Sequence, residues 1–255
     1  LTISALSCHG NPVHPDPAKA EEYHEDMCNT VRLAEKLGVD TITCFSGCPG
    51  DCEASRYPNW VTCAWPDDNL DILKYQWDKV LIPYWKNFVQ AAKDCGVNKI
   101  ALELHPGFSV YNVDTLKRLR EAVGPEIGVN FDPSHLLWQG MEPVAVIRAF
   151  AGMIYHVHAK DVCIDRYNTA LNGVLDTKHY SDEAHRSWIF RTVGYGNDAK
   201  YWKDIFSELR KTGYDGTISI EHEDSLINRL EGLQHAVDMV KSCAIFAETS
   251  GMWWA

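Results

Sequence analysis

Short apolar runs and longer amphipathic stretches alternate along the chain, and this alternation is its clearest structural signal. Runs rich in apolar and β-branched residues predict strands at residues 1–7, 40–45, 99–105, 127–131, 154–159 and 217–220. Stretches with helical spacing predict helices at residues 18–37, 69–95, 113–123, 143–150, 199–212 and 229–247. Repeated strand-then-helix units predict an α/β protein with a parallel sheet.

Residues at the ends of these stretches support individual elements. Asp16 is placed to cap the start of helix 18–37, and Gly38 suits its C-terminal cap. Pro83 predicts a kink inside helix 69–95. A loop at 46–67 and a polar segment at 160–197 lack the regular pattern. No shift in composition marks a linker, so we expect one domain over residues 1–255.

Two parallel architectures fit this order, an open doubly wound sheet and a (β/α)8 TIM barrel. An open nucleotide-binding sheet usually has a glycine-rich turn after its first strand. Here that position reads Ser7-Cys8-His9-Gly10-Asn11-Pro12, which is neither such a turn nor a phosphate-binding loop. Polar residues instead follow several strands, as they do where a TIM barrel carries its active site. The barrel is therefore the predicted fold.

Composition narrows the classes of partner. The 255 residues include 45% hydrophobic and 23% charged side chains, which is typical of a globular protein and not of disorder. A net charge of −11 argues against binding nucleic acid, which needs a basic face. No apolar run is long enough to span a membrane. The nine cysteines are scattered and odd in number, which indicates free thiols in a reducing compartment, so we expect a cytoplasmic protein.

Acidic residues and histidines stand at the ends of five predicted strands. The segments are Cys8-His9, Glu103-Leu104-His105, Asp132-Pro133-Ser134-His135, His156 to Asp161, and Glu221 to Asp224. Glu103, Asp132 and Glu221 would repel one another in one barrel mouth unless a cation balanced them. Two Glu, one Asp and one His are a set of oxygen and nitrogen donors that suits Mn²⁺, Mg²⁺, Co²⁺ or Zn²⁺. His156 lies deeper in its strand, and His222 faces away from its two Glu neighbours, so we expect supporting roles for both.

At these residues the sequence resembles the xylose isomerase-like TIM-barrel superfamily, in its sugar phosphate isomerase/epimerase (AP endonuclease family 2) group. The resemblance runs through essentially the whole chain, and its most specific pieces are ALELHPG, NFDPSHLLWQG, YHVHAKD, RTVGYG and ISIEHED. The ketose 3-epimerases of this group hold one cation by Glu, Asp, His and Glu from the last four strands. The resemblance therefore implies one divalent ion, with Mn²⁺ favoured, on Glu103, Asp132, His158 and Glu221.

The same resemblance implies a sugar or sugar-phosphate isomerase or epimerase. A proton next to a carbonyl is removed through a metal-stabilised enediolate, and Glu103 and Glu221 are the implied acid and base. The candidates for binding substrate hydroxyls or an anionic group are His9, His105, His135, Lys160 and Arg191. Lys160 and Arg191 suit a phosphate or carboxylate, with salt bridges to neighbouring acids as the alternative.

Three other functions are alternatives to this one. A lyase or dehydratase acting on a keto-sugar, keto-inositol or 3-keto-glycoside would use the same enolate and the same metal, and it stays open. A phosphodiesterase like endonuclease IV needs an Asp with a His two residues later. In this sequence Tyr167 stands two residues after Asp165, and Lys178 stands two residues after Asp176. A scaffold without activity fits poorly with a complete set of acids. The expected partners are thus a small carbohydrate, no nucleic acid and no membrane, with a possible homo-oligomer.

Only six strand–helix units are visible, although a TIM barrel has eight. By the resemblance, residue 1 lies at the start of the third strand. We therefore expect a barrel without its first two units. The sheet should show a gap beside the first strand, filled by a further segment or by a partner.

Overall fold

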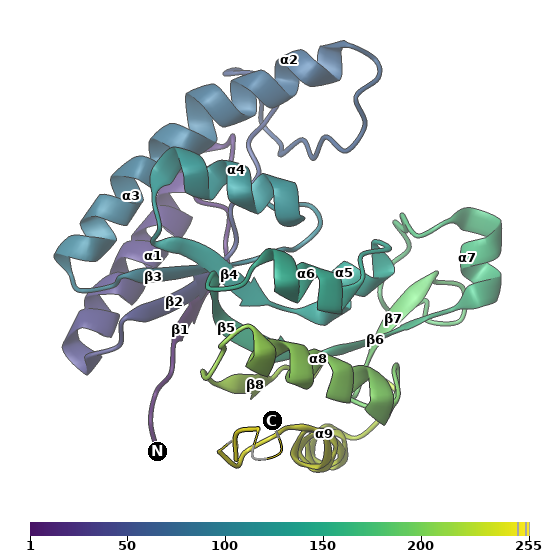
Figure 1. The fold of residues 1–255 in the computed structure, drawn as a ribbon. Helices are drawn as coiled ribbons and strands as arrows, with labels where there is room; N and C mark the ends of the chain where they lie inside the picture. Colours follow the sequence, from purple (N-terminus) through teal and green to yellow (C-terminus); the bar gives the residue numbers. More distant parts are fainter. Residues whose placement is uncertain (249, 253, 255) are drawn as a thin grey trace.

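Six parallel strands form one curved sheet at the centre of the molecule (Figure 1). The computed structural model describes residues 1–248, 250–252 and 254. The strands are β1 (Leu6–Cys8), β2 (Thr41–Cys44), β3 (Lys99–Glu103), β4 (Ile127–Phe131), β5 (Ile154–Ala159) and β8 (Ile218–Ile220), paired in that order. Within the described part of the chain β1 and β8 are the two edges and do not pair with each other. The architecture is the predicted incomplete (β/α)8 barrel.

Helices follow the strands and cover the outer face of the sheet (Figure 1). They are α1 (Pro17–Leu37), α2 (Asp68–Tyr75), α3 (Ile82–Asp94), α4 (Val113–Val123), α5 (Pro133–Trp138), α6 (Pro143–Ala149), α8 (Ala199–Lys211) and α9 (Arg229–Cys243). Their apolar faces meet the sheet in one core that includes Trp77, Trp85 and Trp202. None of the described helices combines the length and apolarity needed to cross a membrane.

Local signals explain where the helices begin and end. The Asp16 side chain accepts a hydrogen bond from the Ala18 amide at the start of α1, and Gly38 ends it with φ 68°. The predicted helix 69–95 is interrupted by a π-helical turn, η1 (Gln76–Leu81), just before Pro83. Proline has no amide hydrogen to continue the α-helical ladder, which accounts for an irregular turn at this place.

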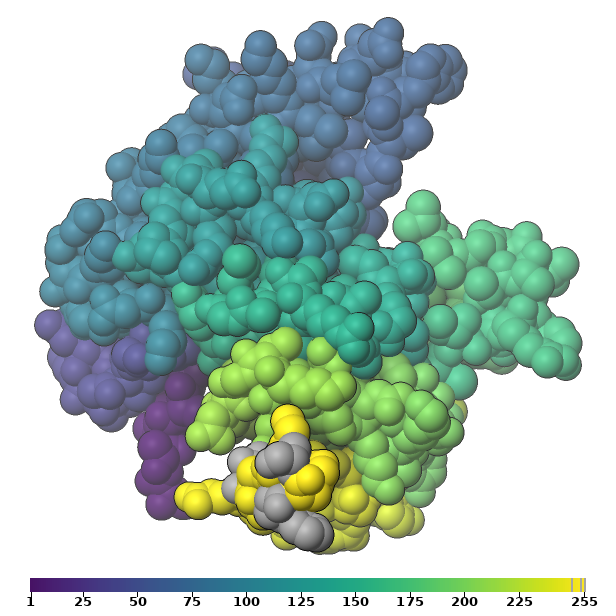
Figure 2. Space-filling model, viewed as in Figure 1, coloured from purple at the N-terminus to yellow at the C-terminus, as the bar shows by residue number. Residues whose placement is uncertain are grey.

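The predicted polar segment 160–197 contains a second small sheet that the sequence pattern did not predict. Strand β6 (Asp161–Ile164) pairs antiparallel with β7 (Trp188–Arg191), and the short helix α7 (Arg166–Asn172) lies between them. We call residues 161–191 the arm. It stands out from the body of the molecule in Figure 2. Helix α5 was also missed, because six residues are too few for a helical period to be visible.

Asp161 joins the arm to the body of the barrel. Its buried carboxylate accepts hydrogen bonds from the amides of Val162, Gly194, Gly196 and Asn197, at 2.8–3.2 Å, and from the Asn197 side chain at 2.7 Å. A Cβ on Gly196 would lie 2.5 Å from the Val162 carbonyl oxygen, so only glycine allows this close approach. The YHVHAKD and RTVGYG segments are therefore held together by one carboxylate.

Replacing Asp161 with Ala should lower the free energy of unfolding by about 3 kcal/mol or more, because several buried amides lose their acceptor at once. Urea unfolding measures this loss. Asp198→Ala is the matched control, since that carboxylate caps α8 by accepting from the Tyr201 amide and its loss should cost about 1 kcal/mol. Equal losses in the two variants would contradict a special role for Asp161.

Candidate metal centre

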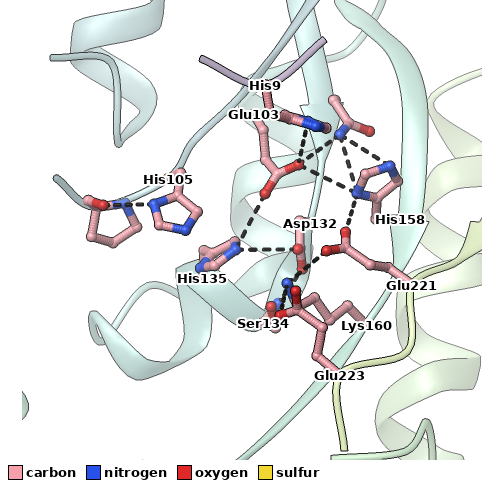
Figure 3. A network of polar contacts seen from close by, with 12 residues as sticks. His9, Glu103, His105, Asp132, Ser134, His135, His158, Lys160, Glu221 and Glu223 are labelled. Atoms are coloured by element: carbon pink, nitrogen blue, oxygen red, sulfur yellow. Dashed lines mark hydrogen bonds and ion pairs between the residues drawn. The ribbon is translucent and has the colours of Figure 1, made fainter. Parts of the chain in front are cut away.

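Four side chains from four neighbouring strands converge at the carboxyl end of the sheet (Figure 3). Glu103 ends β3, Asp132 follows β4, His158 lies in β5, and Glu221 follows β8. One ligand atom from each lies within 4.8 Å of the other three. Because the carboxyl ends of parallel strands meet at one edge, residues far apart in sequence come together there. These are the four residues that the sequence analysis gave as the expected metal ligands.

His158 lies between the two glutamates. Its Nδ1 atom is 2.6 Å from Glu221 Oε2 and 3.3 Å from Glu103 Oε2. Asn130, fully buried in β4, donates a hydrogen bond from Nδ2 to Glu103 Oε2 at 3.0 Å. Its Oδ1 lies 3.0 Å from His156 Nδ1, which places His156 in support of the site. Asn130 was not predicted, although it shares a strand face with Asp132 and the alternation rule could have found it.

His135 connects Glu103 to the third carboxylate, Asp132. Its Nε2 atom lies 3.2 Å from Glu103 Oε1 and 3.5 Å from Asp132 Oδ2, and the ring is almost wholly buried. Asp132 Oδ1 caps α5 by accepting from the Ser134 amide at 2.8 Å. The Asp-x-x-His spacing therefore brings His135 back over Asp132 by one helical turn.

The electrostatics of the site are dominated by buried negative charge. Burial alone would lower the pKa of His158, but Glu103 and Glu221 raise it to about 10. Burial opposes ionisation of Glu221, yet His158 and Lys160 hold its pKa at about 2. Burial raises the pKa of Asp132, whose surroundings stabilise its charge poorly. The three carboxylates therefore place negative charge where a positive ion would be stabilised.

The donors present fit a divalent cation. Among the described side chains, Asp132 Oδ2 and Glu221 Oε2 are buried and make no well-aligned hydrogen bond. A buried carboxylate oxygen without a partner is costly unless it binds a cation. Three carboxylates and one imidazole are donors that first-row divalent metals accept. The structure therefore contains a candidate divalent metal site.

A cavity of about 740 Å³ opens beside this cluster, with Glu103 and Glu221 among its lining residues. Among the residues predicted to bind substrate, His9, His105 and Lys160 line it. Burial lowers the pKa of His105 to about 3, so this ring is neutral in the ordinary pH range. His135 is not among the lining residues, and neither is Arg191, whose Nε donates to Asp224 Oδ2 at 3.1 Å. Arg191 follows Phe190 in β7, so the two side chains leave opposite faces of the strand.

Part of the cavity wall comes from residues that sequence reasoning did not identify. The arm contributes Tyr180, Ser181, Glu183, Ile189 and Phe190, and the barrel contributes Phe45, Glu223 and Ser225. The arm residues lie in a segment whose hydrophobic and polar positions show no regular period, so no sequence pattern indicated that they line the cavity. Glu223 shares a face with Glu221, which was visible in the sequence, but its position beside Lys160 was not.

Comparison with known proteins places the chain among TIM barrels of one family. A family model described as xylose isomerase-like TIM barrel matches residues 1–243. YfiH of Bacillus subtilis (strain 168) is 45% identical over 244 residues, which cover 94% of this chain and 77% of YfiH. Inosose dehydratase of Geobacillus thermodenitrificans (strain NG80-2) is 28% identical over 149 residues, 58% of this chain. The chain spans about half (47%) of that dehydratase.

Solved structures share the fold at low sequence identity. The Escherichia coli 3-keto-D-glucoside 4-epimerase YcjR aligns with a TM-score of 0.64 and 12% identity, over 95% of this chain and 80% of YcjR. The IOLI protein with a bound zinc atom aligns with a TM-score of 0.61 and 18% identity, over 96% of this chain and 78% of IOLI. At these identities the likeness is one of fold.

Adding a divalent ion should raise the melting temperature of the metal-stripped protein, because the ion binds the folded state. At one hundred times its dissociation constant the gain is about 2.7 kcal/mol. Asp132→Asn should remove most of this gain, since it takes a charge from the site but keeps a side chain able to cap α5. Thermal unfolding with and without MnCl₂, together with metal analysis, measures both.

Asp165→Asn is the matched control, because Asp165 caps α7 in the same way but lies away from the cluster. It should keep the whole metal-dependent shift. If Asp132→Asn also kept the whole shift, the metal would bind elsewhere.

Proposed function

The chain belongs to the xylose isomerase-like TIM-barrel family, and from this premise we propose that it is a metal-dependent isomerase or epimerase of a sugar or related polyhydroxy ketone. The observation that supports the proposal most is the convergence of Glu103, Asp132, His158 and Glu221 on one point, where Glu103 and Glu221 line a cavity. The reaction we propose is removal and return of a proton at the carbon next to a carbonyl, through an enediolate.

Glu103, Asp132, His158 and Glu221 would hold the divalent ion, for which we propose Mn²⁺. When bound, the ion supplies a positive charge that stabilises the oxyanion developing on the substrate. The zinc atom named with the IOLI structure supports a divalent ion of this kind, although that protein shares only 18% identity.

Glu103 and Glu221 are the groups we propose to move the proton. Glu103 ends β3 and Glu221 follows β8, and these strands are separated in the sheet by β4 and β5, so the two carboxylates approach the site from different sides. One can therefore take a proton from one face of the carbon and the other can return it to the opposite face. Asn130 and His135 hold Glu103 in place at its two oxygens, and Lys160 holds Glu221 at 2.8 Å.

A lyase is the second candidate, and the inosose dehydratase relative favours it. Removal of the same proton would then be followed by loss of a β-hydroxyl as water. The two reactions share the first step and differ in the fate of the enediolate. Both require an acid and a base beside one carbonyl, which is what Glu103 and Glu221 offer.

Incubation of the Mn²⁺-loaded protein in deuterated water with ketoses, their phosphates, 3-keto-glycosides and 2-keto-myo-inositol tests the proposal. We expect deuterium at the carbon next to the carbonyl of one class, detected by NMR. Exchange with retention of all hydroxyls supports an epimerase or isomerase, and loss of water or of an aglycone supports the lyase. Absence of exchange and of elimination over the whole panel would refute the shared first step.

Glu103→Gln and Glu221→Gln should each reduce exchange at least about 100-fold, since each removes a proton-transfer group. Glu231→Gln is the control, because its side chain is 63% exposed on α9 and should leave the rate unchanged. Circular dichroism and the melting temperature establish that each variant is folded. Full activity in either site variant would show that its glutamate is not the acid or base.

A further inference from the structure

Acidic side chains outnumber cationic ones around the cavity. Glu103, Glu183, Glu221 and Glu223 line it, whereas Lys160 is the sole lysine or arginine among the described lining residues. A phosphate or carboxylate on a substrate is usually held by one or more cations that are free to face it. The number of cations free to face the cavity therefore indicates whether the site suits a charged or an uncharged substrate.

Lys160 is already neutralised within the protein. Its Nζ atom lies 2.8 Å from Glu221 Oε1 and 2.7 Å from Glu223 Oε2, so two carboxylates compete for one charge (Figure 3). The ammonium group also lies 4.3 Å from the centre of the Phe190 ring. With only 3% of the residue exposed, Lys160 has no free direction from which to bind an anion.

The two arginines on the arm nearest the cavity are also engaged. Arg191 pairs with Asp224 at 3.1 Å, away from the cavity. Arg186 is 2% exposed and is packed between the rings of Tyr180 and Trp188, at 4.3 and 4.6 Å from their centres. Both arginines stabilise the arm and its attachment, and neither is among the lining residues.

A bound divalent ion does not reverse this balance. Its two charges offset two of the three ligand carboxylates, Glu103, Asp132 and Glu221, and Lys160 offsets the third. Glu223 and Glu183 then remain as excess negative charge, both lining the cavity. A substrate with its own negative charge would meet two uncompensated carboxylates.

We propose, on the basis of the proposed function, that this site takes an uncharged polyhydroxy ketone and excludes phosphorylated or carboxylated ones. This assigns a selectivity role to Glu223, which blocks Lys160 from serving as an anion site, and a second one to Glu183 on the arm. It replaces the expectation that Lys160 and Arg191 hold a phosphate or carboxylate.

The rest of the cavity wall suits such a substrate. Phe45, Tyr180 and Phe190 present aromatic surface, and Ile189 adds an apolar side chain. The C–H faces of a sugar or cyclitol pack on aromatic rings, while its hydroxyls meet carboxylates and imidazoles. A neutral polyol therefore finds both kinds of partner here.

Binding measurements on the Mn²⁺-loaded full chain test the proposal. The probes are ketohexoses paired with their 6-phosphates, together with 2-keto-myo-inositol, and titration calorimetry or saturation-transfer NMR reports the affinities. We expect uncharged probes to bind and each phosphate to bind at least about tenfold more weakly than its parent. Glu223→Gln should improve phosphate binding relative to the parent by roughly tenfold, as expected for one charge removed at a few ångströms.

Glu183→Gln provides a second, independent variant, with a smaller shift in the same direction, and Glu231→Gln on α9 should leave the ratio unchanged. Phosphates that bind the unmodified protein as well as their parents would overturn the proposal. So would the absence of binding by any uncharged probe, or an unchanged ratio in both Glu223→Gln and Glu183→Gln. Binding of uncharged probes without deuterium exchange would refute the proposed reaction and leave the substrate class standing.

Discussion

The repulsion among buried carboxylates is the constraint on which this structure depends. Glu103 and Asp132 are almost wholly buried within a few ångströms of Glu221, and ionised carboxylates at such distances destabilise one another unless positive charge lies between them. His158 and Lys160 supply part of that charge, and Asp132 Oδ2 is left without a well-aligned partner among the described residues. Negative charge is therefore concentrated at the carboxyl ends of the strands, where the four residues of the candidate metal site meet.

The register of the parallel strands aligns the polar side chains of the site in one row. Glu103 lies opposite Asn130, and Asn130 lies opposite His156, so one row of polar side chains crosses three parallel strands. Val129, Phe131, Val157 and Ala159 take the other face and pack against the helices. A slip by one residue would exchange the two rows, placing carboxylates in the core and valines at the cavity. Packing of the apolar row thus fixes the geometry of the polar one.

This dependence explains what could be predicted from the sequence. The positions of Glu103 and Asp132 at the ends of apolar strands identify them, because a carboxylate in a buried strand needs a partner. The family resemblance, and not the period, selects His158 over His156 on the same strand face. The alternation of strand faces would have found Asn130. The arm could not be predicted in this way, since Tyr180 and Glu183 lie in irregular backbone held by Asp176, Arg186 and other polar contacts. Such contacts depend on three-dimensional positions and leave no period in the sequence.

The ion pairs of Lys160 are the clearest case in which the structure decides between two roles that the sequence left open for a residue. In the sequence, Lys160 is a candidate to hold a phosphate or carboxylate, with a salt bridge to neighbouring acids as the alternative. In the fold, β8 brings Glu221 and Glu223 to the same ammonium group, one from the proposed metal site and one from the cavity. Lys160 thus contacts one carboxylate of the proposed metal site and one further carboxylate of the cavity wall. The net charge of a site can be counted only from the folded structure, because pairing of parallel strands brings together residues that are far apart in the sequence.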